Sequence, residues 1–163
     1  MRIISGELKG RSIKFLKNSV TRPLKDNVRE NIFNILKHSK FLKVEVKNSN
    51  VLDLYSGIGS FGIECISREA KKVTFVEENS TTFKFLSKNL KNLLISHKTK
   101  IFNDRIENIL PRISNEKFSI FFFDPPFADN GFIEIIESVK KNKLFKKDHV
   151  VIIHRGKKAK DKL

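Results

Sequence analysis

The chain contains very little cysteine. Cys65 stands alone among 163 residues, which excludes an internal disulfide and fits a reducing compartment, so we expect a cytoplasmic protein. The four histidines are scattered without metal-ligand spacing, and no metal site is predicted. No apolar run is long enough to cross a bilayer, and the N-terminus shows neither the apolar segment nor the cleavage site of a signal peptide. We therefore expect no membrane partner.

Acidic side chains are also scarce. The sequence holds 18 Asp and Glu against 33 Lys and Arg, a net charge of +15. Residues 1–50 carry a net charge of +8 and residues 138–163 another +8, whereas residues 51–137 carry −1. Two basic ends around a near-neutral middle favour a polyanionic partner such as a phosphate backbone. Because 25 of the 33 basic residues are lysine, a proteome-wide compositional bias is the alternative.

The hydrophobic pattern divides the chain into an extension and a core. Short apolar pairs and glycines over residues 1–20 predict a small basic hairpin, and apolar residues at helical spacing follow Asp26. Beyond residue 50, short apolar runs alternate with helical patterns, which predicts an α/β fold with a mostly parallel sheet and helices on both faces. The expected strands lie at residues 51–54, 73–76, 100–102, 118–123 and 150–153. We expect a basic extension over residues 1–45, packed on a core over residues 46–163.

The most informative stretch is FFFDPPF at residues 121–127, an apolar run that stops at Asp124-Pro125-Pro126-Phe127. Neither proline can donate a backbone N–H, so a strand ladder must end at Asp124. The carboxylate and the carbonyls before the prolines are then left as acceptors at the sheet edge, beside an aromatic ring. Such groups suit a site that holds a flat base and accepts hydrogen bonds from its exocyclic amine. The alternative is a strand ending in a Pro-Pro loop, with Asp124 as a turn residue.

A glycine-rich loop follows the first predicted strand and opens a helix. Gly57, Gly59 and Gly62 allow a tight turn and a close approach of backbone to ligand. They also satisfy the dinucleotide fingerprint, and Glu77 lies 20 residues after Gly57, so a nicotinamide-binding domain is a rival interpretation. Asp53 argues against it, because its negative charge would lie close to a pyrophosphate. A cationic sulfonium with an amino-acid head tolerates that charge.

Four acids end four predicted strands: Asp53, Glu77, Asp104 and Asp124. The carboxyl ends of parallel strands share one rim, which is the ligand crevice of an open α/β sheet. There either Glu77 or the adjacent Glu78 can bind both ribose hydroxyls, and Asp104 can accept a hydrogen bond from an adenine amine. Each acid alone could be a helix cap, but four on one rim favour an adenosine-bearing, cationic ligand.

With these motifs, the chain resembles the RsmD-type enzymes, which methylate the N2 amine of one guanine in 16S ribosomal RNA. The resemblance covers about residues 2–155. It rests on RIISGELKGR at 2–11, TRP at 21–23, DNVRE at 26–30, DLYSGIGSFG at 53–62, FVE at 75–77 and DPPF at 124–127. Two features depart from the family. Leu24-Lys25 stands where threonine is usual, and the chain ends soon after Arg155, where the family often adds two antiparallel strands.

The resemblance implies a Rossmann-like class I methyltransferase core that uses S-adenosyl-L-methionine, with an N-terminal extension that helps to bind RNA. It also implies a monomer that acts on 16S ribosomal RNA or a partly assembled small subunit. The expected catalytic residues are Asp124, Pro125, Pro126 and Phe127. The expected cofactor residues are Asp53, Tyr55, Gly57, Gly59, Glu77 and Asp104. The expected RNA contacts are Lys9, Arg11, Arg22 and Arg29.

Several alternatives stay open from the sequence. Arg29 with Glu30 could form an internal ion pair instead of an RNA contact. An adenine-N6 methyltransferase is the nearest rival, although such enzymes more often carry asparagine where Asp124 stands. A non-catalytic RNA-binding protein with a relic cofactor site and a nicotinamide dehydrogenase are more distant possibilities.

Overall fold

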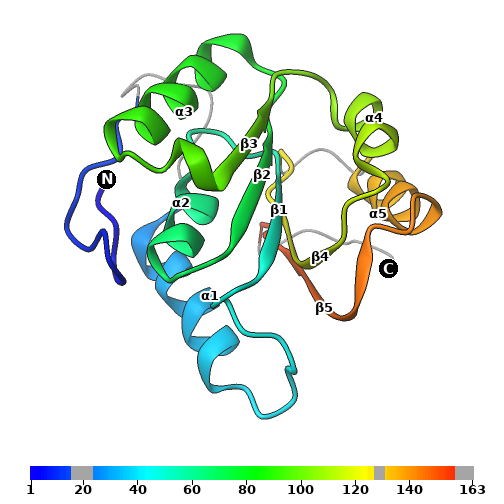
Figure 1. Ribbon diagram of the computed structural model, residues 1–163, viewed down its shortest axis with the longest axis horizontal. Coiled ribbons are helices and arrows are strands. Elements are labelled where there is room, and N and C mark those ends of the chain that lie inside the picture. Colours follow the sequence, from blue (N-terminus) through cyan, green and yellow to red (C-terminus); the bar gives the residue numbers. More distant parts are fainter. Residues whose placement is uncertain (16–23, 127–130, 157–163) are drawn as a thin grey trace.

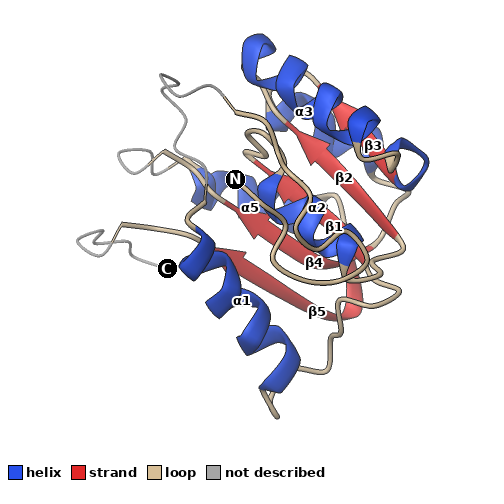
Figure 2. Ribbon diagram, turned by 90° about the vertical axis from the view of Figure 1, so that its left-hand side faces the viewer, coloured by secondary structure: helices blue, strands red, loops and turns tan. Residues whose placement is uncertain are grey.

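The computed structural model describes residues 1–15, 24–126 and 131–156. In this part of the chain, five strands form one parallel sheet in the order β3-β2-β1-β4-β5 (Figures 1 and 2). The strands are β1 (Asn50–Leu54), β2 (Lys72–Val76), β3 (Thr99–Phe102), β4 (Phe118–Phe123) and β5 (Phe145–Ile153). The predicted α/β fold is confirmed, and each strand overlaps the stretch where it was expected.

Helices cover both faces of the sheet (Figure 1). One face carries α1 (Asp26–His38), α2 (Ser60–Ser67) and α3 (Ser80–Asn92), and the other carries α4 (Ile106–Ile109) and α5 (Phe132–Lys141). The short 3₁₀ helices are η1 (Ser96–Lys98) and η2 (Leu110–Ile113). No helix among the described residues is both long and apolar enough to pass through a membrane.

The phenylalanine run of β4 is buried because its side chains alternate between two cores. Phe122 joins the core under α1, α2 and α3, while Phe121 and Phe123 join the core under α4 and α5. Stacked rings then connect the sheet to α1: the centroid of Phe61 lies 4.1 Å from that of Phe122 and 5.3 Å from that of Phe33. This stack fixes α1 against the core.

The N-terminal segment forms less regular structure than the expected hairpin. Residues 1–15 contain one antiparallel bridge, between Arg2 and Ser12. Gly6 packs so closely on the end of α2 that an added Cβ would lie 1.9 Å from the carbonyl oxygen of Ser67. The Ser67 side chain also accepts from the backbone N–H of Leu8 at 3.0 Å. Backbone hydrogen bonds between residues 1–3 and 10–13, together with these contacts to α2, therefore hold this segment in place.

A buried ion network ties the same segment to α1 and α2. The Glu64 side chain is fully buried and accepts from the backbone N–H groups of Ile4 (2.9 Å) and Ser5 (3.0 Å). It also pairs with Arg68 Nε at 3.0 Å and with the equally buried Arg29 Nε at 3.7 Å. Burial lowers the pKa of Arg29, and Glu64 opposes that shift.

The expected RNA contact at Arg29 is therefore corrected. Its guanidinium is 0% exposed and donates to the carbonyl oxygen of Arg2 at 2.6 Å and to Asp26 Oδ1 at 3.0 Å. An internal ion pair had been the alternative interpretation, but the partners are Asp26 and Glu64 rather than Glu30. A guanidinium enclosed in this way is not available to a phosphate backbone, so Arg29 belongs to the scaffold.

Candidate functional site

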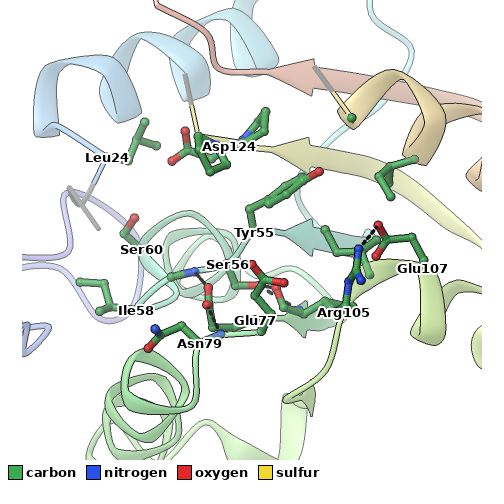
Figure 3. A pocket seen from close by; sticks show the side chains of 18 of the residues that line it. Leu24, Tyr55, Ser56, Ile58, Ser60, Glu77, Asn79, Arg105, Glu107 and Asp124 are labelled. Carbon is green, nitrogen blue, oxygen red and sulfur yellow. Dashed lines mark hydrogen bonds and ion pairs between the residues drawn. The ribbon is translucent and has the colours of Figure 1, made fainter. Parts of the chain in front are cut away.

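A pocket of about 800 Å³ opens at the carboxyl ends of the central strands (Figure 3). Its walls come from segments far apart in the sequence: Leu24, residues 55–58, 77–79, 105–107, 124–126 and the first turn of α5. In the view of Figure 3, Tyr55 lies between Asp124 and Glu77. The fold thus brings the glycine loop and the Asp-Pro-Pro turn to one cavity, as the strand order predicts. No cluster of His, Cys, Asp and Glu among the described residues could hold a metal ion.

The glycine loop makes a tight turn between β1 and α2. Tyr55, Gly57 and Gly59 all have positive φ, at 60°, 56° and 85°. At Gly59, an added Cβ would lie 2.5 Å from Leu86, so the loop can approach α3 only without a side chain there. Tyr55 and Gly57 line the pocket, whereas Gly59 sets the shape of the loop behind them.

Ser56, which the sequence analysis did not single out, joins the ends of β1 and β2. Its hydroxyl donates to the carbonyl oxygen of Asp53 at 2.6 Å and accepts from the backbone N–H of Val76 at 2.9 Å. Its own N–H donates to the carbonyl oxygen of Val76 at 3.0 Å. A serine directly before the first glycine of the loop is the sequence signal for this role.

Asp53 lies beneath the loop, outside the set of residues that line the pocket. Its side chain is almost completely buried, and Oδ2 accepts from the backbone N–H of Gly62 at 3.0 Å. Oδ1 has no hydrogen-bond partner among the described residues. Burial raises the pKa of Asp53 well above its ordinary value, and the neighbouring charges of Asp124 and Glu77 add to the shift. A buried acid with an unsatisfied oxygen suits a polar or cationic ligand nearby.

Glu77 forms the wall between the loop and β2. Its Oε2 accepts from Gly57 N at 2.8 Å, and its Oε1 accepts from Asn79 N at 2.8 Å (Figure 3). Burial raises the pKa of this carboxyl, while the two backbone bonds oppose the rise. Each oxygen accepts one of these N–H groups and keeps a second lone pair, which can accept from a vicinal diol such as that of a ribose.

Asp104 is not among the residues that line the pocket, and its expected contact with an adenine amine stays a prediction. Its Oδ1 accepts from the side chain of Asn108 at 2.8 Å and from the backbone N–H of Arg105 at 2.7 Å. These bonds, led by that of Asn108, lower its pKa. Asp104 therefore stabilises the start of α4, and the pocket wall at this point is made by Arg105, Ile106 and Glu107.

The Asp-Pro-Pro turn begins one residue after β4, and Asp124, Pro125 and Pro126 all line the pocket. Asp124 Oδ1 accepts from Nδ1 of His154 at 2.7 Å. Burial raises the pKa of Asp124, and the hydrogen bond from His154 opposes that rise. The sequence analysis treated His154 only as one of four scattered histidines. Phe127, the expected stacking residue, lies outside the described residues.

The other residues expected to contact RNA are Lys9, Arg11 and Arg22, and their surroundings differ. Lys9 is exposed on the N-terminal segment. The guanidinium of Arg11 donates to the carbonyl oxygens of Asn92 at 2.9 Å and Leu93 at 3.2 Å, so it caps the end of α3. Arg22 lies outside the described residues. Among these basic residues, only Lys9 is seen without such a structural role.

Comparison with known proteins identifies the family. The family model described as Conserved hypothetical protein 95 matches residues 1–162. A relative from Buchnera aphidicola, named Ribosomal RNA small subunit methyltransferase D, is 36% identical over 156 residues, covering 96% of this chain and 78% of the relative. A protein of the same name from Haemophilus influenzae is 33% identical over 159 residues, covering 96% of this chain and 79% of its own.

Solved structures agree with this result. An Escherichia coli protein described as a methyltransferase superposes with a TM-score of 0.81 at 27% identity, over 95% of this chain and 80% of that one. A Haemophilus influenzae protein described as a methylase superposes with a TM-score of 0.75 at 31% identity, over 97% of this chain and 82% of that one. The chain therefore belongs to the Conserved hypothetical protein 95 family, that of the RsmD-type methyltransferases.

Proposed function

We propose that this protein transfers a methyl group from S-adenosyl-L-methionine to the N2 amine of a guanine in 16S ribosomal RNA. One observation carries the proposal: the Asp124 carboxylate, at the end of β4, lines the same pocket as the glycine loop and Glu77. The relatives named as ribosomal RNA small subunit methyltransferases support the RNA substrate. The resemblance to the RsmD-type enzymes supports the guanine N2 position.

The residues around the glycine loop fit the proposed cofactor. Glu77 has the lone pairs to accept two ribose hydroxyls. The acids gathered here, Glu77 and Asp124 on the pocket wall and Asp53 with an unpartnered Oδ1 beneath the loop, suit a cationic group and oppose a pyrophosphate. This charge favours a methyl donor over a nicotinamide dinucleotide. When bound, S-adenosyl-L-methionine supplies a methyl group made electrophilic by a positively charged sulfur.

The Asp-Pro-Pro turn supplies the groups that receive the acceptor base. The lone pair of the guanine N2 amine is delocalised into the ring, so the nitrogen is a poor nucleophile. Asp124 and the Pro125 carbonyl would accept the two amine hydrogens and favour a pyramidal nitrogen directed at the methyl carbon. The amine becomes acidic once it is methylated, so a strong base is not needed. The base must leave its stack to reach this turn, and Phe127 is the proposed stacking partner.

The two basic ends are the proposed RNA-binding surface. Each end carries a net charge of +8, whereas the middle of the chain carries −1, and Lys9 is exposed on the N-terminal segment. In this proposal the extension over residues 1–45 contacts RNA, while the core over residues 46–163 holds the cofactor. We further propose a monomer in the cytoplasm that acts on 16S ribosomal RNA or a partly assembled small subunit, as the resemblance implies.

The test is Asp124→Ala, assayed with labelled methyl donor on small-subunit RNA and particles from cells lacking the protein. We expect S-adenosylhomocysteine binding within a few-fold of wild type by calorimetry, and turnover lower by at least about 100-fold, because an acceptor aligned with the reacting amine is lost. Mass spectrometry should locate the wild-type product at guanine N2.

Asp148→Ala is the matched control, since Asp148 is an exposed acid on β5 and does not line the pocket. Turnover at the wild-type level in Asp124→Ala would refute the role of this carboxylate. Methylation of adenine would point to the rival enzyme class. Binding of NAD without S-adenosylhomocysteine would point to a dehydrogenase.

A further inference from the structure

The end of β5 reaches back to the Asp-Pro-Pro turn. Beyond the last residue of β5, the backbone N–H of His154 donates to the carbonyl oxygen of Phe123 at 2.8 Å. The ladder between β4 and β5 therefore continues for one more bond, to the residue directly before Asp124. This bond places the side chains of His154 and Arg155 beside the turn.

His154 fixes one oxygen of the proposed catalytic carboxylate. Its Nδ1 lies 2.7 Å from Asp124 Oδ1, and both side chains are only about a quarter exposed, at 26% and 24%. Because an ionised carboxylate only accepts hydrogen bonds, Nδ1 must carry the proton. A bond of this length to a charged group is strong and directional. It holds the carboxylate plane, and Oδ2 is then the oxygen that can accept from a substrate amine.

Arg155 holds the next part of the same turn. Its Nη1 donates to the carbonyl oxygen of Pro126 at 3.0 Å. Its guanidinium carbon also lies 4.9 Å from the ring centroid of Phe132, the first residue of α5, in a cation–π contact. Pro126 and Phe132 stand on either side of residues 127–130 in the sequence. Arg155 therefore contacts the chain where it leaves the turn and where it enters α5.

We propose that His154 and Arg155 are positioning residues that hold the Asp-Pro-Pro turn in the geometry needed for methyl transfer. This inference rests on the proposed function. The physical reason is the pair of prolines: without N–H groups, Pro125 and Pro126 cannot be fixed by a strand ladder. Side chains from the neighbouring strand supply the missing restraint. Catalysis by positioning depends on it, because a displacement of about 1 Å can cost roughly 100-fold in rate.

The experiment compares His154→Leu with His154→Asn, in which the amide N–H can replace the Nδ1 donor. We expect His154→Leu to lower kcat by about 10- to 100-fold, in the range seen when a supporting hydrogen bond is removed from a functional group. The KM for RNA and the affinity for S-adenosylhomocysteine should change less than about twofold. His154→Asn should restore most of kcat. This recovery would not follow if the histidine served only to fill space.

His149→Leu is the matched control. His149 lies on β5, the strand that His154 directly follows, but it is exposed, and its ring bonds to the carbonyl oxygen of Lys146 at 2.9 Å. We expect its kcat to stay at the wild-type level. The proposal is overturned if His154→Leu keeps wild-type kcat. It is also overturned if leucine and asparagine lower kcat equally, or if kcat falls only together with melting temperature and cofactor affinity.

A readout without turnover separates this inference from the proposed function. The ¹⁵N chemical shift of the His154 ring in the unliganded protein should show a protonated Nδ1 that changes in Asp124→Asn. If the wild type methylates no RNA, the proposed function fails, even when this signal confirms the contact. If the signal shows an unprotonated Nδ1 or does not respond to Asp124→Asn, the positioning role fails, whatever the enzyme methylates.

Discussion

Two buried acids, Glu64 and Asp53, show how differently this fold treats a charge removed from water. Glu64 is 0% exposed and has four partners, namely two backbone N–H groups and two arginines. Asp53 is 1% exposed, accepts one backbone N–H, and keeps Oδ1 without a partner among the described residues. Both lie in the same layered core, so depth alone does not account for the difference.

The difference separates structural from ligand-binding roles. A buried carboxylate costs several kcal/mol in lost hydration unless hydrogen bonds and opposite charges compensate it. Glu64 is compensated by the protein itself, which uses the acid to hold the N-terminal segment against α1 and α2. Asp53 is compensated only in part, beside a pocket. Because Asp53 does not line the pocket itself, we infer that the missing part is supplied indirectly, through water or the glycine loop, when a ligand is bound.

The largest expected effect on stability comes from removing Glu64, the acid whose hydrogen-bond and charge partners all come from the protein. Glu64→Ala should lower the free energy of unfolding by about 3–5 kcal/mol, because Arg29 stays buried without the only one of its two acidic partners that is itself fully buried. The melting temperature should fall by roughly 10 °C. Urea unfolding measures the free energy of unfolding from the midpoint of the transition and from its dependence on urea concentration. Lys47→Ala is the control, since it breaks only the exposed pair with Glu69 and should cost less than about 1 kcal/mol. Equal losses in the two variants would contradict the network.

A smaller effect should appear in a double-mutant cycle on the same pair. Arg29→Met and Glu64→Gln each leave a partner behind, whereas the double variant removes both charges and keeps an acceptor oxygen for one of the Ile4 and Ser5 N–H groups. We expect a coupling energy of about 1–3 kcal/mol from urea unfolding of all four proteins. If the stability lost in the double variant equals the sum of the two single losses within about 0.5 kcal/mol, the two side chains are neighbours without energetic coupling.

The smallest effect on stability is expected at Asp53, the acid with the unpartnered oxygen. This effect has the opposite sign. The folded-state pKa of Asp53 is raised, so ionisation destabilises the fold as pH rises above the unfolded value of about 4. Asp53→Asn keeps an acceptor for Gly62 and removes this penalty. At pH 7 the variant should be more stable than wild type by roughly 1 kcal/mol, and the difference should vanish below about pH 4.

The same variant should bind the cofactor less well, which completes the contrast with Glu64. We expect the affinity for S-adenosylhomocysteine, measured by calorimetry, to fall by about tenfold, the equivalent of one lost water-mediated hydrogen bond, since Asp53 does not line the pocket itself. If Asp53→Asn were less stable at pH 7 and bound the cofactor normally, Asp53 would be a scaffold residue like Glu64.

Local pattern was enough to predict most of the fold. Strands such as β1 and β4 are continuous apolar runs because both of their faces are covered, and that burial is visible in the sequence. The Asp-Pro-Pro turn and the glycine loop were also predictable, since each depends on a residue type whose backbone properties are local. Their meeting in one pocket follows from the parallel order of the strands.

The errors concern side chains whose environment comes from distant segments. Arg29 was expected to be exposed, and its burial depends on Glu64 and on the backbone of Arg2. Asp104 Oδ1 accepts from the side chain of Asn108, a contact that its spacing from the strand does not predict. His154 pairs with a residue 30 positions away. Composition and periodicity describe each residue with its neighbours, and these contacts are long-range.

The placement of the catalytic turn has a consequence for synthesis on the ribosome. The pocket takes Leu24 from the beginning of the chain, and the turn it contains is held by His154 and Arg155 near the end. Chains emerge N-terminus first, at about 5–20 residues per second, so the glycine loop and Glu77 leave the ribosome before the Asp-Pro-Pro turn and the residues that hold it. In the proposed function, the groups for the methyl donor are therefore synthesised before the groups that position the acceptor base, and the site is incomplete until His154 and Arg155 have been added.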